Sequence, residues 1–412
     1  MTREIRCKTI NGKKTGGKSS IQSGQVKWLS GTVWDTIHGE MSIRSLPYLE
    51  RLDIDFFHAS DNFSVFLNGA SLTDTSDYDV KFHRIAGDLS VFSNSFSDIH
   101  IGGASRSFYT GPDRDSVYVS GNAYLSDNYS LRRIVADDMA EIGDGTANIQ
   151  FTLNQLNSLA AGDSIQTLTK ISFAGLRKVS GHFRVQGGSN GLDSAIYLDF
   201  QSLKEVGSFT LSNAFNQDLV FPEIKKISSI NISDNKANLT KVEFPDLVRI
   251  ENPTIFSQLI ISNNLGLKSI HFPKLERIQN YFSVEKNPEL LNLDSGFPKL
   301  EWVGYSLVVK DNAKLSQCCV VACADLHPGL KNITNNTGNC ADRATAEAAC
   351  APVVTSFSIT ESLDPHIASD STICYGDPIT LKTVADLGGR IDSTAYFSYF
   401  YDLDQDGVYF PL

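Results

Sequence analysis

The stretch "FPKLERIQNYFSVEKNPELLNLDSGFPKLEWVGYSLVVKDNAKL", residues 272–315, contains one pattern twice. A Phe-Pro-x-Leu-x-x-Ile/Val element occupies residues 272–278 and again 297–303. An element of the form apolar-x-apolar-x-x-Asn ends at Asn287 and again at Asn312. Two elements that return in a fixed order after about 25 residues indicate structural repeats that stack on one another.

The Asn-terminated element extends over most of the chain. Ten copies can be placed between residues 63 and 312, at a mean spacing of about 27 residues. The copies at 183–188 and 209–214 keep the apolar positions but lack the Asn, and a further copy ends at Asn154. The Phe-containing element recurs, with variations, at 173–179, 200–206, 221–227 and 244–250, and residues 46–52 are an early copy with Leu in place of Phe. The asparagines that we expect to stack as one structural ladder are Asn68, Asn94, Asn122, Asn235, Asn264, Asn287 and Asn312.

The residue types of the repeat predict its local structure. Alternation of Val, Ile, Phe and Leu with other residues is typical of a short strand with one buried face. The Asn that follows can bond to the backbone and tolerates a turn conformation, whereas the Pro belongs at a strand start or corner because it donates no hydrogen bond. Each unit is too small to bury its own apolar face, so the units must stack. We therefore expect a mainly β fold, a parallel β-solenoid of about ten rungs and roughly 45 Å in length.

The two interleaved elements resemble the receptor L-domain type of leucine-rich repeat, over about residues 35–316 and most closely over 170–316. This resemblance implies an irregular right-handed β-solenoid, as in the ectodomains of insulin and growth-factor receptors and in surface proteins of Bacteroidetes-type bacteria. It implies no shared catalytic residue. The spacing departs from the pattern at 140–170 and 188–196. We expect the solenoid domain to span residues 31–316, and a globular β-sandwich with accidental similarity is the alternative.

Five of the seven cysteines lie in residues 317–350, directly after the last repeat. The end of a solenoid exposes apolar side chains and strand edges, so we expect this segment to form a Cys-rich cap stapled by disulfides. The candidate disulfide cysteines are Cys318, Cys319, Cys323, Cys340 and Cys350. Bacterial members of the resembled family often end in a similar block, which implies a short helix at 341–350. Reduced cysteines, or a zinc site at Cys319, Cys323 and His327, are the alternatives.

Residues 351–412 have a different character. The segments 353–360, 374–385 and 394–404 are typical of strands separated by turns. They resemble the start of an immunoglobulin-like β-sandwich of bacterial surface proteins, which needs roughly 100 residues, so we expect a partial domain and interpret the chain as a fragment. The stretch "DLDQDG" (402–407) places Asp402, Asp404 and Asp406 in the order of calcium-loop ligands, and an acidic hairpin turn is the alternative. No other cofactor is expected.

Charge and hydropathy limit the partners. The formal net charge of −11 argues against a nucleic-acid-binding protein. Residues 1–30 hold seven basic residues against one glutamate, and their Gly, Ser and Lys content predicts a flexible basic tail. No apolar run reaches the roughly 18 residues of a membrane span, and the chain does not begin with the apolar segment of a signal peptide.

Familiar catalytic motifs are missing from the sequence. It contains no HExxH pair, GxSxG nucleophile or GxxxxGK[ST] phosphate loop. Asp53 and Asp55 with His58 form the one compact acid/base cluster in the repeats. They keep open the alternative of a polysaccharide lyase or hydrolase, because such β-helix enzymes place carboxylates and a base on neighbouring rungs.

We expect a non-catalytic function in adhesion or binding. A solenoid offers a large extended surface without a buried reactive group. The interpretation is a monomeric, secreted or cell-surface scaffold, of bacterial type, that presents one face to an extracellular protein or glycan; a receptor ectodomain is a further alternative. Function then lies between the repeated positions, in residues such as "QNY" (279–281) and "GYS" (304–306), and in the irregular rungs at 140–196.

Overall fold

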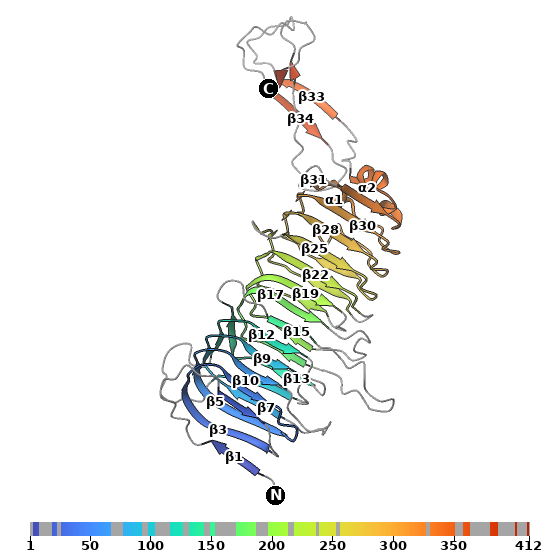
Figure 1. The fold of residues 1–412 in the computed structure, drawn as a ribbon. Helices are drawn as coiled ribbons and strands as arrows, with labels where there is room; N and C mark the ends of the chain where they lie inside the picture. The colour runs from blue at the N-terminus through green and yellow to red at the C-terminus, as the bar shows by residue number, and fades with distance from the viewer. Residues whose placement is uncertain are drawn as a thin grey trace, which may run out of the picture. The chain divides into compact units, whose positions relative to one another are not determined.

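A computed structural model describes the protein in eighteen stretches. They are residues 3–7, 19–22, 26–66, 77–92, 98–103, 116–126, 132–143, 149–152, 170–186, 197–212, 218–235, 239–252, 256–326, 330–350, 357–362, 380–385, 400–401 and 410–411. The chain divides into two units, residues 1–349 and 350–412. The expected mainly β fold is confirmed, because the first unit is a parallel β-solenoid (Figure 1).

Each rung of the solenoid contains up to three short strands, and like strands of successive rungs pair in parallel to form three rows. The first row precedes the corner at which the Phe-Pro pairs lie. It consists of β1 (Arg3–Cys7), the first halves of β3 (Val26–Ile37) and β5 (Arg51–Ala59), β7 (Asp77–Lys81), β10 (Asp98–Gly102), β13 (Arg133–Val135), β16 (Lys170–Ser172) and β18 (Tyr197–Asp199). A separate sheet of β20 (Leu219–Val220), β23 (Lys241–Glu243) and β26 (Ser269–His271) follows in the later rungs.

The second row follows the Phe-Pro corner. Its members are the second halves of β3 and β5, β8 (Arg84–Ile85), β11 (Val117–Val119), β14 (Met139–Ile142), the first halves of β17 (Lys178–Gln186) and β19 (Glu205–Ser212), β21 (Lys226–Ile227), β24 (Arg249–Ile250), β27 (Arg277–Ile278), β29 (Trp302–Val303) and β31 (Asp325–Leu326).

The third row ends each rung. It consists of β2 (Ser19–Gln22), β4 (Met41–Arg44), β6 (Phe63–Phe66), β9 (Leu89–Phe92), β12 (Ala123–Ser126), β15 (Ile149–Thr152), the second halves of β17 and β19, β22 (Ser229–Ser233), β25 (Gln258–Ser262), β28 (Tyr281–Glu285), β30 (Ser306–Lys310) and β32 (Leu330–Thr334). This row extends beyond the ten expected copies, because β2 and β4 precede them and β32 follows them. The sequence motif does not identify the rungs of β4 and β32. Leu46 stands at the Asn position after β4, and Lys331 stands at an apolar position of β32.

The core is a stack of like residues. The Phe of each Phe-Pro corner is buried and packs on the Phe of the next rung, with ring centres 4.8 to 5.2 Å apart from Phe221 through Phe244 and Phe272 to Phe297. Along each third-row strand, buried and partly exposed residues alternate, as in the pattern of β22, β25 and β28. The apolar positions of the repeat therefore contribute to one continuous core.

Four of the expected asparagines form a buried hydrogen-bonded row. The side-chain oxygen of Asn264 accepts hydrogen bonds from the backbone N–H and the side-chain amide of Asn235, at 3.2 and 2.8 Å. The same pair of bonds joins Asn264 to Asn287, and Asn287 to Asn312. The row continues to Asn336, which the sequence pattern did not identify. Because Asn235, Asn264, Asn287 and Asn312 are almost fully buried, each one satisfies polar groups that water cannot reach.

The assignment of Asn122 to this row is wrong. The segment "VYVSGN" fits the pattern, but its strand β11 pairs with β8 and β14 and belongs to the second row. Asn122 therefore lies at the preceding corner, where its backbone N–H and side chain donate to Asp88 at 2.6 and 3.0 Å. Asp88 in turn donates its N–H to Asn62. Asn68 and Asn94 lie outside the described residues.

The expectation of a tail over residues 1–30 is also wrong for its described parts. Strands β1, β2 and the start of β3 all pair within the solenoid. Val26 and Leu29 are buried, and this apolar pair outweighs the basic composition of the surrounding sequence.

The cap contains two short helices, α1 (Cys319–Cys323) and α2 (Arg343–Cys350), and a 3-10 helix (Gly338–Cys340). The helix implied at 341–350 is confirmed, whereas α1 was not expected. A disulfide joins Cys318 to Cys340, with Cα atoms 5.7 Å apart. Lys331 takes the place that Leu307 has in the preceding rung, and its ammonium group lies 3.3 Å from Glu347 of α2. A charged residue at this core position ends the apolar stack.

The second unit contains two antiparallel strand pairs. β33 (Phe357–Ser362) pairs with β34 (Thr380–Ala385), and β35 (Phe400–Tyr401) pairs with β36 (Phe410–Pro411). The strands expected at 353–360, 374–385 and 394–404 overlap β33, β34 and β35.

We predict that Asn287→Ala lowers the free energy of unfolding by about 3 kcal/mol, because the substitution removes the acceptor of two Asn264 donors and leaves buried groups unpaired. Urea denaturation measures the effect. The control is Asn332→Ala, whose side chain is only partly buried on the outer side of β32, and it should change stability by less than about 0.5 kcal/mol. Equal effects of the two variants would contradict a stabilising role of the row.

The residue before each row asparagine has a left-handed backbone, and these residues are Asp234, Asn263, Lys286, Asp311 and Asn335. Lysine carries a steric cost there that Asn tolerates better. We predict that Lys286→Asn raises the melting temperature, by a gain of about 0.5 kcal/mol in stability. Lys299→Asn, at an exposed position outside this row, should give no gain, and a gain at both positions would point to removal of charge instead.

Candidate functional site

The acid/base cluster expected at Asp53, Asp55 and His58 is not one cluster. Asp53 and Asp55 lie in the first row, where they stand beside Asp79 and Lys81 of β7. His58 lies past the corner in the second row, beside Arg84 of β8. The strand β5 changes partners between these residues, so its carboxylates and its imidazole belong to different rows.

The structure instead assembles an ionic cluster from β7 and β10 in the first row. Nδ1 of His100 lies 2.9 Å from one carboxylate oxygen of Asp79, and the ammonium group of Lys81 lies 3.0 Å from the other. The hydrogen bond that Nδ1 of His100 donates to Asp79 raises the pKa of His100 and lowers the pKa of Asp79. Burial opposes the charge of Lys81, but Asp79 still raises its pKa. Sequence reasoning missed this cluster because 21 residues separate Asp79 from His100, and only the register brings them together.

A second histidine lies among hydroxyl groups in the third row. The ring of His182 is 2.7 Å from the hydroxyl of Ser208 through Nδ1 and 2.9 Å from that of Thr210 through Nε2. Burial, and then the charge of Arg184, lower the pKa of His182. Its imidazole is therefore neutral at neutral pH.

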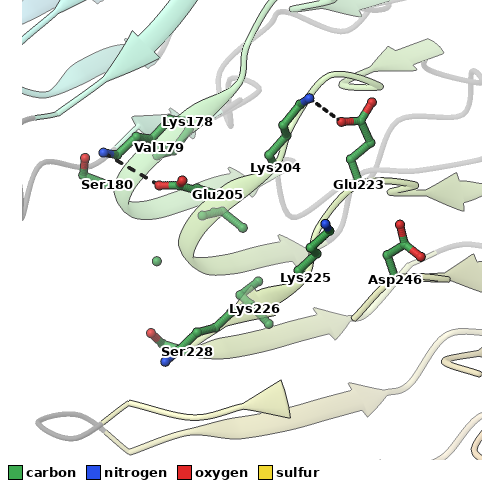
Figure 2. A pocket seen from close by; sticks show the side chains of 13 residues that line it. Lys178, Val179, Ser180, Lys204, Glu205, Glu223, Lys225, Lys226, Ser228 and Asp246 are labelled. Carbon is green, nitrogen blue, oxygen red and sulfur yellow. Dashed lines mark ion pairs between the residues drawn. The ribbon is translucent and has the colours of Figure 1, made fainter. Parts of the chain in front are cut away.

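The second row carries a charged hollow of about 840 Å³ over β17, β19 and β21 (Figure 2). Two of its lysines face carboxylates on neighbouring rungs. Lys204 lies 2.7 Å from Glu223, and Lys178 lies 3.7 Å from Glu205. Exposed ion pairs of this kind contribute little stability, but they neutralise the surface. The hollow is therefore rich in charge while the charges largely cancel.

A smaller hollow of about 490 Å³ follows along the same row, over the rungs of β24, β27 and β29. The guanidinium of Arg277 lies over the ring of Trp302, 4.1 Å from its centre, which is a cation–π contact. The side-chain oxygen of Gln279 accepts the backbone N–H of Asn252 at 2.7 Å. This hollow thus combines an aromatic ring, a cation and two amide side chains.

Apolar side chains are exposed at the corner between this hollow and the third row. We call them the aromatic edge, and its members on four successive rungs are Phe256, Tyr281, Tyr305 and Leu330. Phe256, Tyr305 and Leu330 are 68%, 54% and 65% exposed. The Tyr281 ring lies 6.1 Å from that of Phe256 and 5.1 Å from that of Tyr305.

Two of these aromatic residues belong to the variable segments "QNY" and "GYS" that the sequence singled out. The local backbone brings them close together, because the N–H of Tyr305 donates to the carbonyl of Asn280 at 2.9 Å. Gly304 is required next to it, since a Cβ at that position would collide with the carbonyl oxygen of Gln279. Of the irregular rungs at 140–196, the structure describes 140–143, 149–152 and 170–186.

The remaining predicted site residues lie apart from these surfaces. The thiol of Cys319 donates to Asp294 at 3.1 Å, and Cys318 is in the disulfide with Cys340. The side chains of Cys323 and Cys350, together with His327 and the calcium candidates Asp402, Asp404 and Asp406, lie outside what the structure describes. Among the described residues, no group of three or more His, Cys, Asp or Glu side chains is arranged to hold a metal ion.

None of the helices in the described stretches is both long and apolar enough to cross a membrane.

Comparison with protein families, with curated proteins and with solved structures finds no significant match to this chain. The assignment of function therefore rests on the surfaces themselves.

We predict that an NMR titration finds the pKa of His100 above its ordinary value of 6.5 and the pKa values of His58 and His182 below it. Asp79→Asn should lower the pKa of His100, because the charged partner is lost, and should leave that of His182 unchanged. A pKa of His100 that does not respond to Asp79→Asn would contradict the contact.

The same shifts set the sign of the pH dependence of stability. His100 contributes stability below its ordinary pKa, and that contribution is lost as the pH rises through its raised folded value. His58 and His182 contribute stability when the pH is above their ordinary pKa. That contribution is lost as the pH falls through their lowered pKa values in the folded protein.

Proposed function

We propose that this protein is a non-catalytic binding scaffold of the cell surface or extracellular space, which binds an extracellular protein or glycan through the aromatic edge. The observation that carries the proposal is a row of apolar side chains at the same corner of four successive rungs, of which Phe256, Tyr305 and Leu330 are more than half exposed. Exposed apolar groups that gather in one place are typical of interaction surfaces. Tyrosine and tryptophan suit such surfaces because they combine a large ring with a polar group.

The extracellular setting of the proposal draws on the cap. A disulfide between Cys318 and Cys340 fits an oxidising compartment. In this proposal the solenoid is of the receptor L-domain, leucine-rich-repeat type found in bacterial surface proteins. The antiparallel strands after residue 350 are then part of an immunoglobulin-like module, and the chain acts as a monomer.

The position of the aromatic edge supports binding of an extended ligand. Its members follow one another along the solenoid axis, because β25, β28, β30 and β32 pair in register. The hollow with Arg277 and Trp302 borders it on the side of the second row. Ligand contacts are thus offered over several rungs rather than in one deep pocket, which is how solenoid proteins use their surfaces.

We predict that Tyr281→Ala combined with Tyr305→Ala weakens ligand binding at least about tenfold, since buried aromatic contacts dominate most interfaces. The screen uses the whole chain against glycan and extracellular-protein arrays, followed by titration calorimetry on each hit. Tyr48→Ala is the matched control, because Tyr48 is 49% exposed in the loop between β4 and β5. Hits that bind the double variant and the wild type equally would overturn the proposal.

A polysaccharide lyase or hydrolase is the second candidate, and the cluster of Asp79, Lys81 and His100 favours it. A histidine oriented by a carboxylate can act as a general base, and a neighbouring lysine can neutralise a developing negative charge. The side chain of His100 is 49% exposed and so accessible to substrate. Release of reducing ends or unsaturated products by the wild type, and its loss in His100→Gln, would establish this activity in place of simple binding.

A further inference from the structure

The third row presents an outer face on which charge is scarce. From β19 to β30, outward residues alternate with buried ones, and most carry hydroxyl or amide groups. The examples that matter here are Ser208, Thr210, Ser229, Asn231, Gln258 and Ser283. In the third-row parts of these strands, the charged residues at the described outward positions are Glu285 and Lys310, which pair with each other at 3.1 Å. This face therefore offers hydrogen-bonding groups, and the charges at its described outward positions cancel.

His182 adds to this character at the edge of the face. Its ring bonds to the hydroxyls of Ser208 and Thr210, and burial keeps the pKa of the imidazole low. The imidazole at neutral pH is thus one more uncharged group that both donates and accepts.

The aromatic edge borders the same face. Tyr281 is the first residue of β28 and stands beside Gln258 of β25, while Tyr305 directly precedes Ser306 of β30. Because the strands β22, β25, β28 and β30 stack side by side (Figure 1), the rings form one margin of the face along the solenoid axis. A ligand along that axis meets aromatic rings on one side and hydroxyl or amide groups on the other.

These groups match an uncharged sugar chain better than other extended ligands. Sugar hydroxyls both donate and accept hydrogen bonds, as Ser, Thr, Asn and Gln do, and the C–H faces of sugar rings pack on aromatic rings. A polyanion requires unopposed cations, but the cation at the described outward positions of this face, Lys310, pairs with Glu285. A protein partner is expected to bury a continuous central apolar patch, whereas Ile260 and Val308, the apolar residues in the middle of this face, are separated by Ser283.

We propose that the third-row face from β19 to β30, together with the aromatic edge, binds a neutral polysaccharide whose chain runs parallel to the solenoid axis. This inference rests on the proposed binding function and assigns the class of its ligand. Binding here is non-covalent and spread over several rungs, so longer chains bind more tightly than short oligomers.

The test uses the whole chain and soluble polysaccharides as probes. Laminarin, mannan and xyloglucan are the neutral probes, and heparin and polygalacturonate are the charged ones. At least one neutral probe should bind, with an affinity that changes less than twofold between about 50 and 500 mM salt, because no counterions are released. Tyr281→Ala with Tyr305→Ala, and separately Gln258→Ala, should weaken that binding at least about threefold. Lys204→Ala, in the charged hollow, is the control and should leave it unchanged.

The outcomes separate the two proposals. Binding of the charged probes alone, with an affinity that falls steeply with salt and with Lys204→Ala, overturns the neutral ligand but leaves a binding scaffold. Binding of a protein ligand that depends on Tyr281 and Tyr305, with no neutral probe bound, also overturns the neutral ligand and leaves a binding scaffold. Failure of every neutral probe to bind overturns this inference. If every ligand found binds the Tyr281→Ala, Tyr305→Ala variant as tightly as the wild type, the proposed function is overturned as well. Circular dichroism of each variant confirms that it is folded.

Discussion

The backbones of successive rungs hydrogen-bond to one another residue for residue, and the rest of the structure depends on this register. A slip by one residue would turn every core side chain of a strand outward. The buried asparagines hold the register at one corner, because each side chain bonds both to the next rung and back to an earlier one. Asn287, for example, donates to the carbonyl of Ile261 on the earlier rung and to the side-chain oxygen of Asn312 on the next rung. A rung that shifted would leave these groups unpaired in the core.

The same register organises the outside of the molecule. Residues at equivalent outward positions lie about 4.8 Å apart on neighbouring strands, so a chemical type that recurs in the sequence becomes a continuous stripe. In the second row this places Glu205 between Lys178 and Lys226, so that side chains of opposite charge lie next to each other. In the third row it gives hydroxyl and amide groups with an aromatic margin. Two faces with opposite binding chemistry thus share one core.

The solenoid ends where the stacked pattern is replaced. Lys331 of β32 occupies the position that pairs with Leu307 of the preceding rung. Its ammonium group contacts Glu347 and backbone carbonyls of the α1 region. The disulfide of Cys318 and Cys340 then connects the chain before and after this rung. Polar groups and a covalent link cover an edge that would otherwise offer apolar surface and unpaired strands.

Some features of this protein follow from its sequence, and others depend on how the strands pair. A mainly β stacked fold, and the row through Asn235, Asn264, Asn287 and Asn312, follow from residue type and spacing alone, because the repeat is local and periodic. The register of the N-terminal rungs does not follow from the sequence, because the motif matches two different corners of a rung. The motif alone assigns Asn122 to the third row, whereas it lies at the preceding corner. Only pairing with β8 and β14 decides between them.

The candidate surfaces show the same division. The sequence by itself identified "QNY" and "GYS" as variable segments, because they interrupt a repeated pattern. It could not place Tyr281 beside Tyr305, nor His100 beside Asp79, since residues more than twenty positions apart meet only when rungs of unequal length stack in register. The sequence thus determined the rung and its core. The tertiary structure decided which outward residues become neighbours, because loop lengths that vary between rungs hide the register from any fixed spacing.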